Sequence, residues 1–244
     1  MAEFVPIVTI MIFLACVMVF AFSFGNTWDM VNSIFVTPER LRNMIVSLCF
    51  YPNLIAEKPY ILVTHMLVHA DWLHILINMA LLLSVGIFLE ERIGSFNFLL
   101  VFLFSGFCSI VFNILLRALI SMPNVASIGA SGAVFGVIML GALIMPDKKV
   151  PIIVIPILNL LAIFVYFFDF KLEPNLVVAI IFYSIFSVMM VFLGSGTLSE
   201  ISHLGGMIGG FVYFWFIEKD EDKKEKRINV ENADNYGFSL VKEV

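Results

Sequence analysis

Charged residues are scarce in this sequence. Asp, Glu, Lys and Arg together make up 14% of its 244 residues, whereas apolar residues make up 61% and the mean hydropathy is +1.03. An average soluble domain is about half apolar and about a quarter charged. A soluble core of this size could not bury 26 Phe and 13 Met together with so much Ile, Leu and Val. The composition therefore excludes an ordinary soluble protein and makes lipid the solvent for much of the surface.

Basic stripes, cysteine pairs and metal-binding motifs are also lacking. The net charge is −5, and no stripe of Lys and Arg is present that would follow a nucleic acid, so we expect no nucleic-acid partner. Cys16, Cys49 and Cys108 form no CxxC, which favours apolar packing over a disulfide framework or a zinc ribbon. Because no HExxH motif and no pair of aspartates within a span occur, neither a zinc nor an aspartyl membrane protease is expected. We expect no metal and no cofactor.

Long uncharged runs predict the membrane-spanning helices. A helix needs about 20 apolar residues to cross a bilayer, with a range of about 17–25. Seven runs reach this length: Phe4–Trp28, Trp72–Leu89, Ile93–Leu116, Ala118–Pro146, Val150–Phe168, Pro174–Ser199 and Ile201–Ile217. Val150–Phe168 contains Pro151 and Pro156, which favours an embedded or interfacial segment that does not cross. In Ala118–Pro146, residues 121–127 are turn-like, so the helix is expected to begin near residue 129.

We therefore predict an all-α polytopic membrane protein with a bundle of six transmembrane helices. The expected membrane-embedded domain covers residues 1–217, with helices at 5–25, 72–90, 95–117, 130–146, 174–194 and 200–217. Residues 26–71 are expected to form an interfacial loop, because Trp and Tyr favour the headgroup region and the loop and its end contain Trp28, Tyr51, Tyr60 and Trp72. Residues 218–244 are expected to form a charged cytoplasmic tail that is largely disordered.

The Lys and Arg residues predict the orientation of this bundle. With six crossings and both termini in the cytoplasm, ten of the 14 Lys and Arg residues lie on the inner side. Four lie on the outer side: Arg40, Arg42, Lys58 and Arg117. Since positive charge is enriched in cytoplasmic loops, this count favours cytoplasmic N- and C-termini in a multi-pass integral membrane protein.

Three of the predicted helices carry polar side chains near their first turn. His74 and Asn78 share a face of the second helix, Ser131 lies at the start of the fourth, and His203 lies in the sixth. These three helices all run from outside to inside, so the four residues fall in one layer just below the outer surface. A serine beside an imidazole, with hydrogen-bond donors for an oxyanion, is the arrangement that acyl transfer needs.

Two small-xxx-small pairs predict close contact between the helices that carry the serine and the last histidine. The pairs are Gly132 with Gly136 and Gly206 with Gly210. Small residues at this spacing let the backbones of membrane helices approach each other. Close contact here would bring Ser131 and His203 within hydrogen-bond reach.

Each of these features also has a simpler interpretation. The sequence Gly-Ala-Ser-Gly is common at packed helix surfaces, and His203 can be a buried structural residue or a proton relay. His74 with Asn78 can form a polar clamp between helices. His65, His69 and His74 could suggest a metal site, but no carboxylate within a span completes a ligand set.

Taken in order, these motifs resemble those of the rhomboid intramembrane serine proteases, from about residue 60 to residue 216. The motifs are His69-Ala-Asp-Trp-Leu-His74, Asn78-Met79, Leu89-Glu90, Gly94-Ser95, Gly129-Ala130-Ser131-Gly132 and His203-Leu-Gly-Gly206 with Gly210. The resemblance implies a six-helix rhomboid fold in which residues 146–171 form an embedded inner loop and residues 174–193 a gating helix. It also implies proteolysis of single-span or polytopic membrane protein substrates within the lipid bilayer.

The same resemblance implies roles for individual residues. Ser131 resembles the nucleophile and His203 its base, in a dyad with no third carboxylate. The implied oxyanion hole consists of His74, Asn78 and the Ser131 backbone N–H, with Gly129 in the loop of the nucleophile. Phe135 matches an aromatic residue that stacks on the catalytic imidazole in some members. Lys58-Pro59-Tyr60 stands where many members carry a Trp-Arg pair.

The leading hypothesis is therefore an intramembrane serine endopeptidase with a Ser-His dyad. The alternative is a proteolytically inactive, rhomboid-like protein that binds membrane helices, although such relatives usually lack the nucleophile or the base. A third hypothesis, a His-dependent transporter, would need polar residues deeper in the bundle. The predicted spans are almost wholly apolar below the layer of Ser131.

Overall fold

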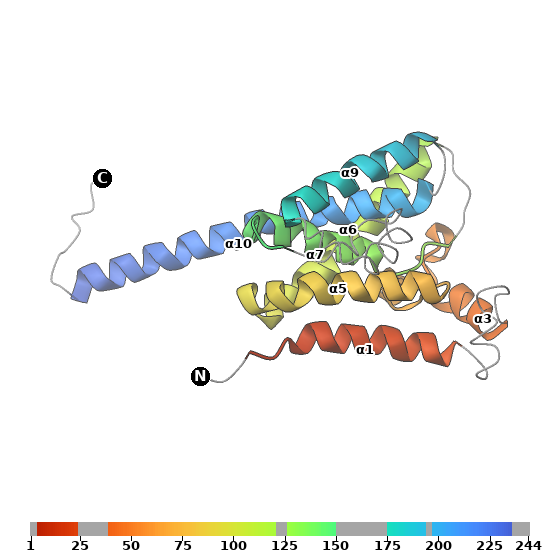
Figure 1. Cartoon of the computed structure of the whole chain (residues 1–244), viewed down its shortest axis with the longest axis horizontal. Coiled ribbons are helices and arrows are strands. Elements are labelled where there is room, and N and C mark those ends of the chain that lie inside the picture. Colours follow the sequence, from red (N-terminus) through yellow and green to blue (C-terminus); the bar gives the residue numbers. More distant parts are fainter. Residues whose placement is uncertain (1–3, 24–38, 121–125, 150–174, 194–196, 236–244) are drawn as a thin grey trace, which may run out of the picture.

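The computed structural model describes residues 4–23, 39–120, 126–149, 175–193 and 197–235 as helices and their connections (Figure 1). The longer helices are α1 (Ile7–Phe22), α3 (Glu39–Leu48), α5 (Trp72–Ile93), α6 (Ser95–Ile120), α7 (Ser131–Ile144), α9 (Leu176–Leu193) and α10 (Thr197–Asn235). The short helix α4 (Ile61–Thr64) and the 3-10 turns η1 (Pro52–Leu54) and η2 (His65–Leu67) lie between α3 and α5. The described part of the chain holds isolated β-bridges but no named strand, so the all-α class is confirmed.

Three helices are long and apolar enough to cross a membrane by length and composition: Trp72–Ile93, Ser95–Leu119 and Leu176–Leu193. Helices α1 and α7 are also apolar, but they have only 16 and 14 residues. Large apolar side chains point outward from the bundle, and Phe192 on α9 is 86% exposed. These features are those of an integral membrane protein whose outer surface is covered by lipid. The count of six crossings stays a prediction.

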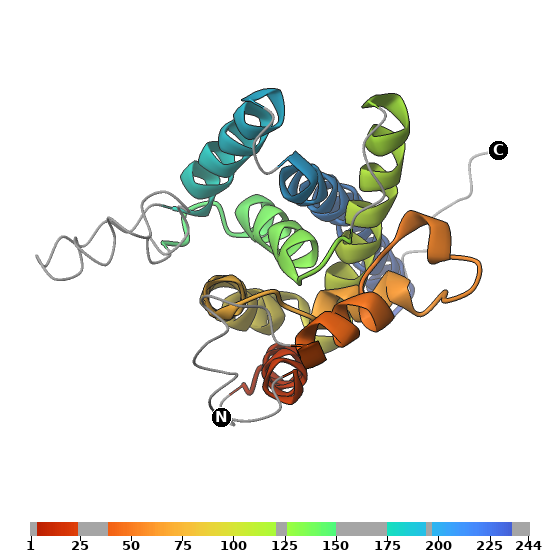
Figure 2. The same cartoon turned by 90° about the vertical axis from the view of Figure 1, so that its right-hand side faces the viewer.

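Helix α7 lies in the middle of the bundle. Figure 2 looks along the helices and shows α7 with α5, α6, α9 and α10 around it, while α1 packs on the outer side of α5. Ten of the 14 residues of α7 are buried, from Gly132 to Ala142. Glycine and alanine recur along this helix, so neighbouring helices can approach it from several sides. The first residue of α7 is thereby surrounded by the ends of other helices.

The start of α5 is fixed by an N-cap. The Asp71 carboxylate accepts a hydrogen bond of 2.8 Å from the backbone N–H of His74. Such a cap satisfies one of the free N–H groups of the first turn and stabilises a helix by about 1 kcal/mol. At the other end, α5 stops at Gly94, whose φ of +79° favours glycine. The cap therefore fixes the position of the backbone that carries His74.

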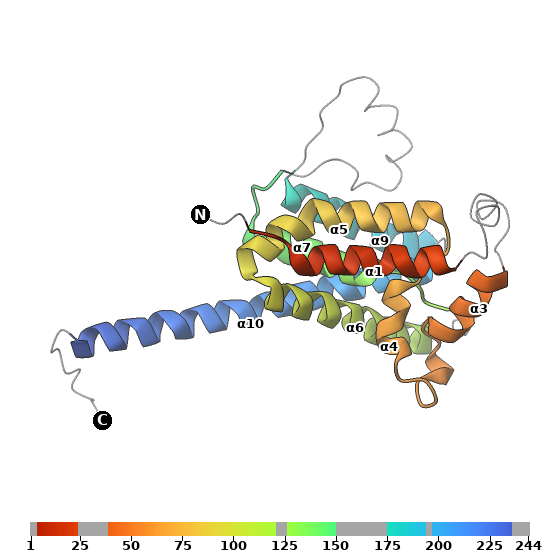
Figure 3. The ribbon, with the colours of Figure 1, turned by 90° about the horizontal axis from the view of Figure 1, so that it is seen from below.

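Helix α10 is longer than the sequence suggested. Its first part corresponds to the predicted helix 200–217, but the helix continues without a break to Asn235 and projects beyond the other helices (Figure 3). The expectation of a largely disordered tail is therefore wrong for residues 218–235. Glu and Lys recur along this stretch, and both residues have good helix propensity. The predicted embedded segment 150–168 lies outside the described residues.

Candidate active site

The loop before α7 is held by backbone hydrogen bonds to the segment between α3 and α5. Phe50 and Ser127 exchange N–H···O bonds of 3.0 and 2.9 Å, and the Gly129 N–H donates to the His65 carbonyl oxygen at 2.9 Å. Gly129 has a φ of +106°, and a Cβ on it would lie 2.6 Å from Nε2 of His74. Both the backbone conformation and the close ring require glycine at this position. The loop thereby places the residues that precede α7 against His74.

Helices α7 and α10 touch backbone to backbone. A Cβ on Gly206 would overlap the carbonyl oxygen of Gly132, and a Cβ on Gly210 would overlap that of Gly136. Small residues permit this close approach of membrane helices. The predicted nucleophile begins α7 next to the first of these pairs, and the predicted base lies about one turn before Gly206. The predicted helix contact is therefore present, and it brings the first turns of the two helices together.

In the described part of the chain, the imidazole of His203 contacts Phe135, Glu200 and Ser199. Its ring lies 4.3 Å from the Phe135 ring, measured between centroids, with 35° between the planes. Its Nδ1 lies 3.1 Å from Glu200 Oε2, and its Nε2 lies 3.5 Å from Ser199 Oγ. Among the hydrogen bonds of the described residues, none joins His203 to Ser131. The structure thus brings the His203 imidazole to the helix turn that begins with Ser131, in a geometry in which Nε2 points toward Ser199.

His74 lies on the side of α5 that faces the loop before α7, and Asn78 lies one turn further along the same side of the helix. The Ala70 N–H donates to Nδ1 of His74 at 3.4 Å, so a neutral imidazole carries its proton on Nε2, the atom that faces Gly129. Asn78 Nδ2 donates to the His74 carbonyl oxygen at 2.8 Å and has a second hydrogen to offer. In the described part of the chain, Oδ1 of Asn78 is buried without a hydrogen-bond partner. His74 therefore presents a donor to the loop that leads to Ser131.

A cavity of about 230 Å³ with both polar and apolar walls lies where these elements meet. Its walls come from α5, α6, α7, α10 and the loop before α7, and they include His74, Ser131, Ser199 and Ser202. One water molecule in the liquid occupies about 30 Å³, so this volume has room for several. Hydroxyl and imidazole groups can hydrogen-bond such water, which the apolar surroundings of the bundle cannot do. The cavity is therefore the place where water could reach Ser131.

Two further histidines support this region. Burial lowers the pKa of His65 to about 4 and that of His69 to about 3, so both rings are neutral near pH 7. Nδ1 of His65 lies 3.0 Å from the Ile61 carbonyl oxygen, and the ring of His69 packs edge to face on His74 with centroids 5.0 Å apart. Across the residues that the structure describes, no three His, Cys, Asp or Glu side chains gather to hold a metal ion. Both rings instead pack behind His74 and the loop before α7.

Sequence reasoning missed the contact between Glu200 and His203. In the sequence, Glu200 is only the charged residue between the apolar runs Pro174–Ser199 and Ile201–Ile217. The family resemblance implied a dyad with no third carboxylate. The structure instead places that carboxylate on Nδ1 of the imidazole. The three-residue spacing of the two side chains, about one helical turn, was the signal that could have found the contact. The hydrogen bond of Ser187 to the same carboxylate has no comparable signal in the sequence.

The fold and this site define an all-α membrane protein in which serines and histidines line a cavity and a histidine–carboxylate pair lies nearby on α10. The Rhomboid domain family matches residues 56–219, which is more than half of the chain. The chain therefore belongs to the rhomboid family.

Curated proteins of several organisms are similar to the chain over part of their length. Rhomboid protein 1, mitochondrial, of Saccharomyces cerevisiae is 27% identical over 160 residues, which are 65% of this chain and 42% of that protein. Rhomboid-like protein 11, chloroplastic, of Arabidopsis thaliana is 30% identical over 190 residues, or 74% and 62% of the two chains. Rhomboid-like protease 3 of Toxoplasma gondii is 32% identical over 101 residues, or 41% and 36%. The matched regions thus span less than two thirds of each of these relatives.

Proposed function

We propose that this protein is an intramembrane serine endopeptidase that cleaves transmembrane segments of other membrane proteins. The observation that supports this most directly is the contact of the Phe135 and His203 rings at 4.3 Å. Phe135 lies one helical turn after Ser131, so this contact puts the imidazole beside the turn that carries the serine. Ser131 lines a cavity inside the apolar bundle, and a serine with a neighbouring imidazole is the pair of groups that hydrolysis of a peptide bond in a membrane requires.

In the proposed reaction, Ser131 Oγ attacks the scissile carbonyl carbon, and His203 takes the hydroxyl proton on Nε2. The carbonyl oxygen becomes an oxyanion, which the His74 Nε2–H, an Asn78 amide hydrogen and the Ser131 backbone N–H stabilise. His203 then gives its proton to the leaving amine, and the acyl-enzyme forms. Water from the cavity attacks this ester with His203 again as the base, which releases the acid product and restores the serine. The hydrogen bond between Ser131 and His203 forms when substrate binds, since catalytic hydrogen bonds are often loose without it.

The alternative function is that of an inactive rhomboid-like protein that binds membrane helices without cleaving them. The test is incubation of the purified protein with a single-span reporter protein, followed by N-terminal sequencing of the products. We expect a new N-terminus within or next to the apolar span of the reporter. A reporter that binds and stays intact would favour the alternative.

The oxyanion donors yield a graded prediction. His74→Ala or Asn78→Ala is expected to lower kcat by about 10–1000-fold, because one donor is worth roughly 2.7–4 kcal/mol in favourable cases and less where others compensate. Ser131 should still react with an activated acylating probe, but more slowly. Cleavage rates of the reporter by the two variants, each with its far-UV spectrum as a folding control, provide the measurement. If kcat is unchanged in both variants, the two side chains are structural clamps only.

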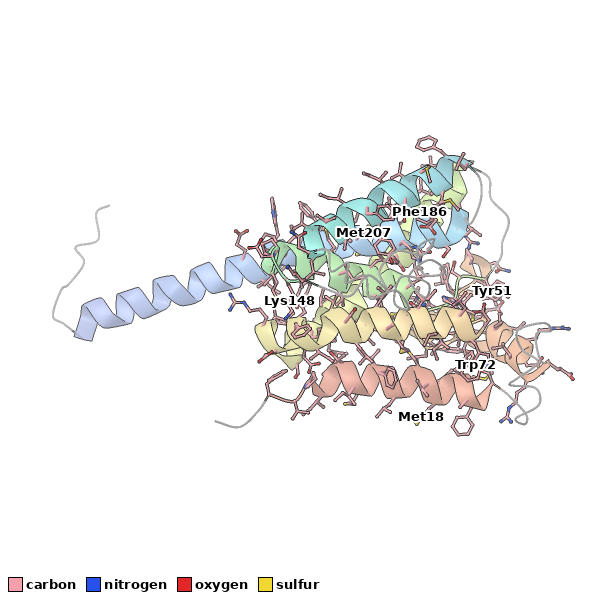
Figure 4. The ribbon with its side chains drawn as sticks, in the orientation of Figure 1. Met18, Tyr51, Trp72, Lys148, Phe186 and Met207 are labelled. Carbon is pink, nitrogen blue, oxygen red and sulfur yellow. The ribbon has the colours of Figure 1, made fainter. Side chains whose placement is uncertain are left out.

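We further propose that the site lies near the outer face and that both termini are cytoplasmic. In Figure 4, Tyr51 and Trp72 lie at one end of the bundle and Lys148 lies at the other. Aromatic residues favour the headgroup region on either side, whereas Lys is enriched on the cytoplasmic side. Ser131 belongs to the end of Trp72, because α5 and α7 both begin there.

Single-cysteine labelling tests this orientation. The variants carry one cysteine at position 149, 171 or 197 in a background without Cys16, Cys49 and Cys108, and they are placed in sealed, right-side-out vesicles. A membrane-impermeant maleimide is expected to label position 197 and neither of the other two. Labelling at position 171 from outside would mean that residues 150–168 cross the membrane. Such a crossing contradicts the proposed orientation.

A further inference from the structure

Glu200 and His203 form a contact that the proposed dyad does not use. Both residues lie on α10, and the carboxylate Oε2 is 3.1 Å from Nδ1 of the imidazole. The side chains are only 12% and 13% exposed, so the pair is largely shielded from water. The spacing of three residues puts both side chains on the same face of the helix. The pair is therefore set by the helix itself and does not depend on a flexible loop.

A second helix holds the same carboxylate. Ser187 on α9 is fully buried, and its hydroxyl donates to Oε2 of Glu200 at 2.6 Å. A carboxylate in an apolar bundle is costly unless hydrogen bonds or an opposite charge compensate it. Here, the hydroxyl from α9 and the imidazole from α10 both meet that requirement. The position of Glu200 is therefore determined from two sides.

The contact with Glu200 determines how the imidazole can act. When Nδ1 carries a proton and donates it to the carboxylate, the lone pair of the neutral ring is on Nε2. Nε2 is the atom that would accept the proton of Ser131. Once it has done so, the carboxylate stabilises the imidazolium ion that forms. The Phe135 ring restricts the imidazole from its face, so ring and carboxylate together define its orientation.

We propose that Glu200 is a positioning residue for His203, which makes this site a Ser-His-Glu arrangement in place of a bare dyad. The inference rests on the proposed protease function and deepens it. Glu200 acts through the imidazole and does not touch the substrate. Among the described residues, the other titratable groups that face the pair are His74 from α5, which interacts electrostatically with His203, and Tyr183 from α9, which interacts with Glu200.

The test compares Glu200→Gln with wild type in cleavage of the single-span reporter. Glutamine keeps the size of the side chain, but its amide can donate to Nδ1 and so favour the tautomer with the proton on Nε2. We expect kcat to fall by about 10–1000-fold, less than the ~10⁴-fold loss when a buried triad carboxylate is replaced by its amide. KM should stay unchanged, because the interaction that is lost acts in the transition state. Glu200→Asp keeps the charge and is expected to recover part of kcat.

A matched control is Glu218→Gln, which removes an exposed carboxylate from the same helix and should leave kcat and KM unchanged. Ser187→Ala, which removes only the hydroxyl on Glu200, is a second variant and is expected to lower kcat by about 2–10-fold through a loosened carboxylate. A kcat of Glu200→Gln equal to or above that of wild type would overturn the proposal. If Glu200→Gln does not fold, an unchanged kcat in Ser187→Ala overturns it.

The same series separates this inference from the proposed function. If wild type cleaves the reporter, Ser131→Ala does not, and Glu200→Gln equals wild type, only the role of Glu200 is wrong. If wild type shows no cleavage that depends on Ser131, the protease function itself is wrong, and the role of Glu200 in it is wrong as well.

Discussion

Ser131→Ala and His203→Ala are each expected to lower cleavage of a single-span reporter by about 10⁴–10⁶-fold, because a nucleophile and its base act as a unit. Neither change should unfold the protein. Ser131 is half-buried at a cavity wall, so alanine removes no core packing there. His203 is only 13% exposed, so alanine removes its packing on Phe135 and its contact with Glu200, which should lower the melting temperature without unfolding the protein. The measurement is the rate of fragment formation, with the melting temperature of each variant in detergent as a control for folding.

Ser199→Ala is the matched control for these variants. Ser199 lines the same cavity, and its hydroxyl lies 3.5 Å from Nε2 of His203, so it is the obvious rival for the role of nucleophile. We expect Ser199→Ala to keep most of the activity. Loss of cleavage in Ser199→Ala together with full activity in Ser131→Ala would show that the nucleophile is Ser199 on α10 and that our assignment to Ser131 on α7 is wrong.

Gly206→Ala is expected to abolish cleavage by separating α7 from α10. The added Cβ would overlap the backbone carbonyl of Gly132, which cannot rotate out of the way as a side chain could. Overpacking of a tight core costs about 1–3 kcal/mol or more, which exceeds the gain of about 1 kcal/mol from replacing glycine by alanine in a helix. The separation also moves His203 away from the start of α7. The melting temperature and the cleavage rate of the variant test both effects.

Gly141→Ala provides the comparison. This glycine also lies within α7, but the nearest atoms to an added Cβ are side-chain methyl groups of Val85 and Leu176, at 3.0 and 3.4 Å. Such groups can shift by a few tenths of an ångström, so we expect a much smaller loss of stability and near-normal cleavage. Equal effects of Gly206→Ala and Gly141→Ala would show that the contact of α7 with α10 does not control the site.

The sequence predicted the elements of the site better than their contacts. Charged residues bound the apolar runs, so the beginnings of α5 and α10 could be placed to within a few residues, and with them His74 and His203. The glycine pairs predicted the contact of α7 with α10, because a backbone approach in a membrane leaves the small-residue spacing as its signature. In both cases, the pattern lies within a single helix, so residues close together in the sequence are enough to detect it.

Contacts between distant segments could not be predicted in this way. The hydrogen bond of Ser187 to Glu200 joins α9 to α10, and the bond of Gly129 to His65 joins the loop before α7 to η2. Both depend on how helices rotate and slide against each other, which apolar periodicity fixes only coarsely when lipid faces most of the surface. The helix beyond Ile217 was missed for another reason: its charged residues suggested disorder, although Glu and Lys are also good helix formers.

The central claim is that Ser131 is the nucleophile, and labelling with a fluorescent fluorophosphonate tests it most directly. The probe phosphonylates a serine hydroxyl that a nearby base activates, and mass spectrometry of the digested protein identifies the modified residue. We predict that wild-type protein in detergent is labelled at Ser131, that Ser131→Ala is not labelled, and that His203→Ala is labelled far more slowly. Labelling of Ser131→Ala at the wild-type rate, or modification of another serine in the wild-type protein, would contradict the account.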